Sequence, residues 1–250
     1  MKDLGNALNM AISMFTVIPL PKYIWEERSA KHIMKIYPLI GLVIGGLWYG
    51  AYYLLKLIGC QAILSSAILL AVPYLLTGFL HLDGFMDVSD ALLSRRPKEE
   101  KIRILKDSTV GAFAVISLAL VLIIEFAAIY TVLVNGKNPL YFIIIPIVSR
   151  SMVGYFMITK DSIGESYFGK LFKDGTGIVD KVILIGIYLI MILLSYRISV
   201  NHLIMVILMG IVGFLLVNNC EKELGGINGD VAGYILVISE LVGILTLGII

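Results

Sequence analysis

The chain has 250 residues, of which 59% are hydrophobic and 15% are charged, and its formal net charge is +2. Soluble domains carry about 25% charged residues, so this composition excludes an ordinary soluble protein, and the small net charge excludes a nucleic-acid-binding one. Cys60 and Cys220 lie far apart in the sequence and form no CxxC pair, so they indicate neither a disulfide framework nor a zinc site.

The N-terminal stretch Leu4–Leu20 is only weakly apolar, because it contains Asn6 and Asn9 and ends among the prolines Pro19 and Pro21. No small-residue cleavage site follows it, so we expect no removable signal peptide. Three alternatives stay open for this stretch: it spans the membrane, lies in the interface, or re-enters from one side.

Seven longer apolar runs follow, and each approaches the ~20 residues with which a helix crosses a membrane. They predict an all-α fold, a polytopic integral membrane bundle of about seven transmembrane helices that forms a single domain over residues 1–250. Gly41, Gly45 and Gly46 in the first run are typical of closely packed membrane helices. The runs are Ile36–Ile58, Ala62–Leu80, Thr109–Val134, Leu140–Ile158, Val182–Ser199, the short His202–Val217, and Val231–Ile250.

Lysine and arginine predict the orientation, since cytoplasmic loops of membrane proteins are enriched in both. Basic side chains gather in segments 22–35, 95–106 and 160–181, and Lys222 precedes the last run. With seven spans these segments share one face, whereas the opposite turns are short. We therefore expect a multi-pass protein of the cell membrane with its long segments in the cytoplasm and its C-terminus outside.

An acidic stripe follows the second run. Asp83, Asp87 and Asp90 stand at positions i, i+4 and i+7, which places them within about 60° of arc on one helix face. Like charges on one face repel unless a cation lies between them, and Mg²⁺ is typically held by one or two carboxylates plus substrate phosphates. We interpret the stripe as a Mg²⁺ site; a solvated polar face of a helix is the alternative.

Two further helix starts are expected on the same side of the membrane. Lys106-Asp107-Ser108-Thr109 opens the third run, and Gly225-Gly226-Ile-Asn228-Gly229-Asp230 opens the last one. The positive end of a helix dipole favours phosphate nearby. N-capping by Asp107 or Ser108 in the first segment, and by Asp230 in the second, is the alternative.

Three charged residues lie deep inside the predicted spans, where charges are costly and usually face a partner or a cavity. Arg150 and Glu240 lie at similar depths, roughly 13 and 15 Å from the cytoplasmic ends of their helices at 1.5 Å per residue. We predict a structural ion pair between them in preference to substrate contact. Glu125 lies nearer the outer side and has no assigned role. His81 adjoins the acidic stripe and serves in proton transfer or phosphate contact, or simply ends a helix.

Two motifs are specific enough to indicate a family: His81-Leu-Asp83-Gly84-x-x-Asp87-x-x-Asp90 and Lys106-Asp107-Ser108-x-x-Gly111-Ala112. They resemble the adenosylcobinamide-GDP ribazoletransferase (cobalamin synthase) family, and the similarity covers the whole chain in order and in hydropathy. Val17 departs from the family, whose members often carry arginine there, so any phosphate contact of that arginine is absent here or supplied elsewhere. Supporting segments are Gly226-Ile-Asn228-Gly229-Asp230-x-x-Gly233, Glu240, and Phe15-Thr16-Val17-Ile18-Pro19-Leu20-Pro21.

The resemblance implies a Mg²⁺-dependent membrane enzyme for the last assembly step of cobalamin. Adenosylcobinamide-GDP would react with α-ribazole, or its 5′-phosphate, to give adenosylcobalamin or its phosphate and GMP, by positioning and charge neutralisation at phosphorus. We predict Asp83 and Asp87 as catalytic metal ligands, with His81 as a further catalytic candidate. The remaining candidates are Asp90, Asp107 and Asp230 for one or two metal sites, and Gly84, Arg95, Arg96, Lys106 and Asn228 for substrate contacts.

Other functions compete with this interpretation. A CDP-alcohol phosphotransferase also joins Asp-Gly to later aspartates, but that family has Ala-Arg where this chain has Asp87-Val88, and its later aspartate motif is missing. An intramembrane prenyltransferase typically needs two aspartate-rich motifs with different spacing. A transporter would place its carboxylates near the bilayer midplane, whereas most carboxylates here cluster at one face. The sequence leaves open whether the protein forms a homo-oligomer.

Overall fold

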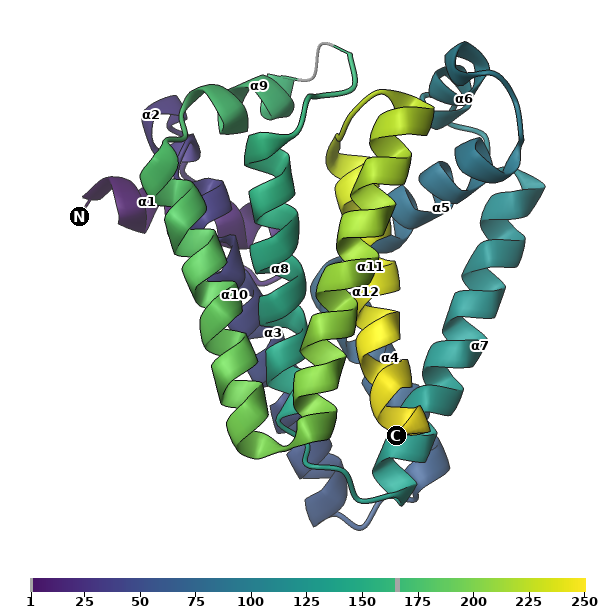
Figure 1. Cartoon of the computed structure of the whole chain (residues 1–250). Coiled ribbons are helices and arrows are strands. Elements are labelled where there is room, and N and C mark those ends of the chain that lie inside the picture. Colours follow the sequence, from purple (N-terminus) through teal and green to yellow (C-terminus); the bar gives the residue numbers. More distant parts are fainter. Residues whose placement is uncertain (1, 165–166) are drawn as a thin grey trace.

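The computed structural model describes residues 2–164 and 167–250, and in these residues the chain forms twelve α-helices and no extended sheet (Figure 1). Six helices are long and apolar enough to cross a membrane, and the count rises to seven when α4 (Ala62–Leu76) and α5 (Leu80–Leu93) are taken as one broken span. The all-α membrane bundle is therefore confirmed. The six are α3 (Ile33–Leu57), α7 (Ala112–Val134), α8 (Tyr141–Thr159), α10 (Ile178–Ile198), α11 (Val200–Leu224) and α12 (Gly229–Ile249).

The remaining helices are shorter: α1 (Lys2–Phe15), α2 (Glu27–Ala30), α6 (Lys98–Leu105) and α9 (Tyr167–Asp174). The N-terminal stretch gives only the 14-residue α1, which is shorter than the ~20 residues of a span. One face of α1 packs on the bundle through Ala7, Met10 and Ala11. The predicted spanning alternative for this stretch is therefore wrong.

Several predicted boundaries also differ from the structure. The fifth run begins as a helix at Ile178, four residues before the predicted Val182. The second run ends as a helix at Leu76 because the chain bends there, and the third begins at Ala112, three residues later than predicted. The sixth run is not short: α11 continues through polar residues to Leu224 and has 25 residues. Hydropathy alone missed this extension because it lies beyond the apolar part of the helix.

Helix α8 forms the centre of the bundle. In its most apolar stretch of 18 residues, 83% of the residues are buried, a larger share than in any other described span. It crosses α3 closely, since a Cβ atom on Gly41 would lie 2.3 Å from the carbonyl oxygen of Pro146. One on Gly45 would lie 2.8 Å from the Cα atom of Ile143. The packing role predicted for these two glycines is confirmed. Gly46 has no such neighbour within 4 Å, so the prediction is wrong for that residue.

The two ends of the bundle differ. Helices α2, α5, α6 and α9 gather at one end, which we call the loop-rich end, whereas the tight turns α3–α4, α7–α8 and α10–α11 lie at the other, as does the C-terminus (Figure 1). The basic segments predicted to share a face therefore lie at one end of the molecule. The sides of α7 and α10 expose many large apolar residues, as expected of helices that contact lipid.

Candidate active site

The acidic stripe lies on α5, which leaves the direction of α4 by 91°. Gly78 and Phe79 make the bend with left-handed backbone, at φ +59° and +61°. The backbone amide of Val17 donates to the carbonyl of Leu76 at 2.9 Å, so the N-terminal segment satisfies one of the groups that the bend frees. Because of this bend, the stripe is a separate helix at the loop-rich end and not the end of a straight membrane span.

Two glycines bring α5 against α12. A Cβ atom on Gly84 would lie 2.7 Å from the Cα atom of Asp230, and one on Gly233 would lie 3.0 Å from the carbonyl oxygen of His81. Such distances are possible only between backbones without side chains at the crossing. The predicted substrate contact Gly84 thus faces Asp230, and its position explains how the two acidic segments come together.

Four carboxylates gather at this crossing. Asp83, Asp90 and Asp230 all act electrostatically on Asp87, which is the central member of the group. Among the described residues, none of the four forms an ion pair with a lysine or arginine. Like charges this close are unfavourable unless a cation lies between them.

Asp83 and Asp230 also line one enclosed cavity of about 170 Å³. That volume equals roughly six water molecules at about 30 Å³ each, enough for a phosphate group and a cation but not for a nucleotide or a corrin ring. The bulky parts of any such substrate must lie outside it, at the loop-rich end. The lining residues are Met14, Phe15, Met34, Tyr37, Leu80, His81, Asp83, Val153, Met157, Phe172, Gly229, Asp230 and Ala232.

Asn228, predicted to contact substrate, has two contacts within the protein. Its Oδ1 accepts a hydrogen bond from the amide of Val231 at 2.9 Å and so caps α12, while its Nδ2 donates to Oδ2 of Asp230 at 2.8 Å. Asn228 is therefore the N-cap of α12, and the carboxylate of Asp230 is not used for capping. The alternative reading of Asp230 as a cap is wrong.

The loop before Asn228 is clamped to the loop after α8. The amide of Ile227 donates to the carbonyl of Asp161 at 2.7 Å, and the amide of Ile163 donates to the carbonyl of Ile227 at 3.1 Å. Gly226 has φ +158°, and a Cβ atom there would lie 2.2 Å from the Asp161 carbonyl oxygen. These contacts fix the start of α12, and with it Asp230.

Asp90, at the far end of the acidic stripe, and Asp107 lie apart from each other. Asp90 lies against Gly111, the N-cap of α7, where a Cβ atom would come within 2.1 Å of both carboxylate oxygens. Asp107 is exposed in the α6–α7 loop, and its Oδ1 accepts from the amide and the hydroxyl of Thr109 at 2.9 and 2.8 Å. These bonds lower the pKa of Asp107. Asp107 is not the cap of α7, and it is not among the acids that act on Asp87.

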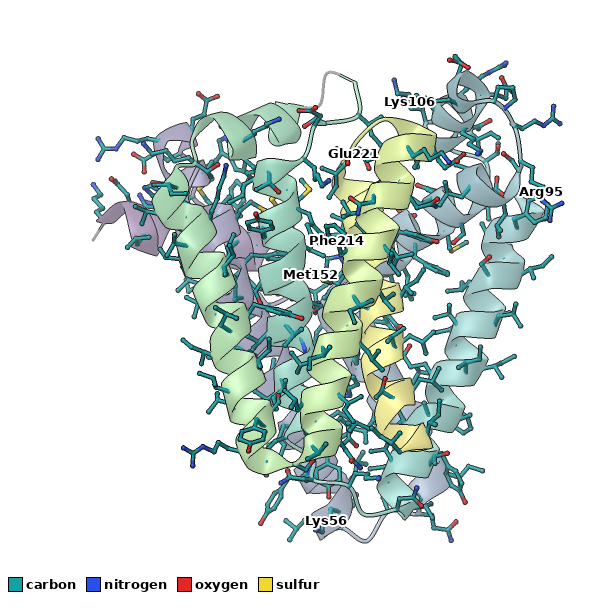
Figure 2. The ribbon with its side chains drawn as sticks, viewed as in Figure 1. Lys56, Arg95, Lys106, Met152, Phe214 and Glu221 are labelled. Carbon is teal, nitrogen blue, oxygen red and sulfur yellow. The ribbon has the colours of Figure 1, made fainter. Side chains whose placement is uncertain are left out.

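The predicted basic contacts lie at the rim. Figure 2 shows Arg95 and Lys106 at the periphery of the loop-rich end. Arg95 has a left-handed backbone, with φ +54°, and Arg96 follows it in the same α5–α6 loop. Lys106 lines a separate open pocket together with Arg103 and Asp107. These cations can attract phosphate to this end of the bundle, but they do not line the cavity.

A comparison with known families identifies the chain. A family model described as cobalamin-5-phosphate synthase matches residues 7–248. The chain belongs to this family. An adenosylcobinamide-GDP ribazoletransferase of Clostridium perfringens (strain SM101 / Type A) is 58% identical over the whole of both chains.

More distant members are also similar over most of their length. An adenosylcobinamide-GDP ribazoletransferase of Clostridium botulinum (strain Alaska E43 / Type E3) is 47% identical over 98% of each chain. One of Geobacillus thermodenitrificans (strain NG80-2) is 31% identical over 94% of this chain and 92% of its own. No solved structure matches the chain.

In this member of the cobalamin-5-phosphate synthase family, the predicted intramembrane ion pair is present. Arg150, 1% exposed, pairs with Glu240, and Ser149 donates a hydrogen bond to the same carboxylate at 2.7 Å. The pair joins α8 to α12 inside the bundle. A buried arginine without its acid would be strongly unfavourable, so the pair fixes how these helices meet.

Two tyrosines of the polar interior could not be predicted. The hydroxyl of Tyr37 lies 3.5 Å from Nε2 of His81. The same hydroxyl also interacts with the guanidinium group of Arg150. Tyr74 donates to Glu125, a residue that had no assigned role. A tyrosine in an apolar helix has no distinctive sequence signal, and only the packing of α3 and α4 shows what these two residues contact.

Proposed function

We propose that this protein joins adenosylcobinamide-GDP to α-ribazole, or its 5′-phosphate, and releases GMP. The observation that carries the proposal is the 58% identity, along the full length of both chains, to a protein named adenosylcobinamide-GDP ribazoletransferase. The acidic cavity at the α5–α12 crossing supports it, because the reaction occurs at phosphate groups. The reaction is the final assembly step of cobalamin.

The carboxylates of α5 and α12 fit Mg²⁺. They are hard oxygen donors, they are close enough to act on one another, and they have no basic partner among the described residues. Among the described residues, no group of three or more His, Cys, Asp or Glu side chains is placed so that it could hold a metal ion by itself. We therefore assign Asp83, Asp87 and Asp230 as ligands that would bind Mg²⁺ only together with substrate phosphate oxygens, and Asp90 as a candidate ligand of a second Mg²⁺ ion.

The chemistry is displacement at the phosphorus that links the cobinamide arm to GMP. The oxygen of an α-ribazole hydroxyl bonds to that phosphorus, the phosphorus–oxygen bond to GMP breaks, and its electron pair leaves with GMP. Asp83, Asp87 and Asp230 would hold Mg²⁺, which when bound would neutralise charge on the phosphate oxygens. The hydroxyl proton needs an acceptor within hydrogen-bond reach, and His81, which lines the cavity beside Asp83, is our candidate.

The protein supplies position and exclusion of water. The Asn228 amide orients Asp230, the α5–α12 crossing sets its distance from Asp83, and Tyr37 holds the ring of His81. Apolar side chains from α1, α3, α8 and α9 close the rest of the cavity. Charges act more strongly in such an enclosed site than in water, which favours phosphate transfer over hydrolysis.

The basic segments favour a cytoplasmic position for the loop-rich end in the cell membrane. Nucleotides and Mg²⁺ would then reach the cavity from the cell interior. The cations Arg95, Arg96 and Lys106 would contact or attract the diphosphate from the rim, outside the cavity.

The proposal is tested in membranes from cells that produce the protein. We expect GMP release only when adenosylcobinamide-GDP, α-ribazole and Mg²⁺ are all present. Asp83→Asn and Asp87→Asn should each abolish the release while the protein remains inserted. The matched control is Asp3→Asn, since Asp3 pairs with Arg28 at the exposed surface, where a salt bridge contributes little.

Each outcome decides a separate point. GMP release without α-ribazole would indicate a hydrolase and overturn the transferase assignment. Release at the wild-type rate in both aspartate variants would overturn the assigned site but not the reaction.

A further inference from the structure

A second hollow lies on the lipid-facing side of the bundle, away from the acidic cavity. It is a groove of about 500 Å³ between α8, α10 and α11. Figure 2 shows two of its residues, Met152 and Phe214, next to each other between α8 and α11, below the loop-rich end. The groove is lined by Ser151, Met152, Tyr155, Phe156, Leu184, Ile185, Tyr188, Ile192, Ile207, Gly210, Ile211, Phe214 and Leu215.

The chemistry of its walls selects an apolar occupant. Nearly all lining side chains are aliphatic or aromatic. The hydroxyl of Ser151 already donates to the carbonyl of Ile147 at 2.6 Å, and that of Tyr188 donates to the carbonyl of Val206 at 3.0 Å. A polar ligand would therefore lose its hydration here without gaining those hydroxyl donors.

The groove lies within the hydrocarbon part of the membrane. Its α10 residues, Leu184 to Ile192, lie roughly 9 to 21 Å from the start of that helix at 1.5 Å per residue. Since the hydrocarbon core is about 30 Å thick, this depth runs from the half of the bilayer nearest the loop-rich end to just beyond the bilayer midplane. Acyl chains of that leaflet are the apolar molecules that reach it.

A lysine stands at the end of the groove where a lipid headgroup would lie. Lys181 is three and four residues before Leu184 and Ile185, so its side chain starts one helical turn above two groove residues on the same face. Its ammonium makes no hydrogen bond or ion pair with any described residue. An unpaired cation at this level complements a lipid phosphate, and long basic side chains near helix ends reach the interface.

We propose that the groove binds one acyl chain of an anionic phospholipid, with the headgroup phosphate at Lys181. This site is independent of the transferase reaction. A helix from a second copy of the chain fits less well, because 500 Å³ corresponds to only about one turn of a helix 10–12 Å in diameter with a pitch of 5.4 Å. A flexible single chain can occupy so short and narrow a recess.

The test measures lipids bound to the full-length protein in mild detergent by native mass spectrometry. Phosphatidylglycerol and phosphatidylcholine with identical acyl chains are titrated separately. We expect one phosphatidylglycerol to bind in preference to phosphatidylcholine. Ile211→Trp, which fills the groove from a half-exposed position, should abolish this binding. Lys181→Gln should weaken it about fivefold, the factor that corresponds to ~1 kcal/mol per basic residue near a lipid surface.

Two matched controls separate the site from general lipid contact. Ile123→Trp places the same ring on the lipid-exposed side of α7, a helix that does not line the groove, and Lys222→Gln removes an exposed lysine elsewhere at the same end. Both should bind phosphatidylglycerol like the wild type. Equal binding of the two lipids, or equal loss of binding in Ile211→Trp and Ile123→Trp, would overturn the proposal. A wild-type dimer that Ile211→Trp alone dissociates would also overturn it, because a second copy would then occupy the groove.

Discussion

Replacement of Gly84 by alanine should separate α5 from α12 where their carboxylates meet. The added Cβ atom would lie 2.7 Å from the Cα atom of Asp230 and 2.8 Å from its carbonyl oxygen. Carbon atoms in favourable contact lie about 3.5–4.0 Å apart, so the two helices would have to move by about 0.8 Å. The atoms in the way belong to the backbone and cannot rotate aside. Asp83 and Asp230 would no longer be held at their native distance.

The expected effect is on rate more than on folding. A misplacement of about 1 Å can cost on the order of 100-fold in rate, whereas overpacking of this kind costs about 1–3 kcal/mol of stability. We expect Gly84→Ala to lower kcat for GMP release about 100-fold, in protein that still elutes as a folded species in detergent.

The matched control for this experiment is Gly46→Ala. A Cβ atom at Gly46 meets no heavy atom within 4 Å, so the same substitution in another membrane helix should leave kcat unchanged. A wild-type kcat for Gly84→Ala would refute the reasoning, because the close crossing would then have no bearing on the carboxylates.

Two further predictions concern the polar contacts around the site. Arg150→Leu should reduce the yield of folded protein in detergent size-exclusion chromatography, since a buried acid left without its partner costs about 3–5 kcal/mol, and the double variant with Glu240→Leu should recover much of it. A normal yield with lost GMP release would instead indicate that Arg150 contacts substrate. Asn228→Ser should keep the α12 cap and the Tm but raise the Mg²⁺ concentration needed for half-maximal rate, because the donor to Asp230 is lost. Asn228→Ala should also lower stability by about 1 kcal/mol. An unchanged Mg²⁺ requirement in Asn228→Ser would contradict the orienting role.

Much of the architecture could be predicted from the sequence because the bilayer imposes it. A helix must satisfy its own backbone and span about 30 Å, so apolar run lengths identify most of the spans. Depth along a helix is equally simple to count, and it predicted the Arg150–Glu240 pair. The basic segments predicted that the long loops share one end of the bundle, because membrane proteins concentrate lysine and arginine on one side of the bilayer.

The arrangement of the site could not be predicted, because it depends on contacts between distant segments. The left-handed Gly78–Phe79 pair redirects α5 by 91°, a change that hydropathy does not record. Asp107 belongs to the same family motif as Gly111, yet the loop places it in a separate open pocket. We predicted Gly84 as a substrate contact from its place in the motif. The structure shows that Gly84 lies where α5 crosses α12, a contact between distant segments that the sequence does not reveal.

The central claim is that Asp83 and Asp230, from different helices, bind one divalent cation with the substrate diphosphate. Its most direct test is electron paramagnetic resonance of Mn²⁺, used in place of Mg²⁺, with purified protein and adenosylcobinamide-GDP. Wild-type protein should bind Mn²⁺ in a substrate-dependent manner, and Asp83→Asn and Asp230→Asn should each weaken that binding at least tenfold, the factor for about 1.4 kcal/mol, while Asp3→Asn should not. Unchanged Mn²⁺ binding in both variants would contradict the claim.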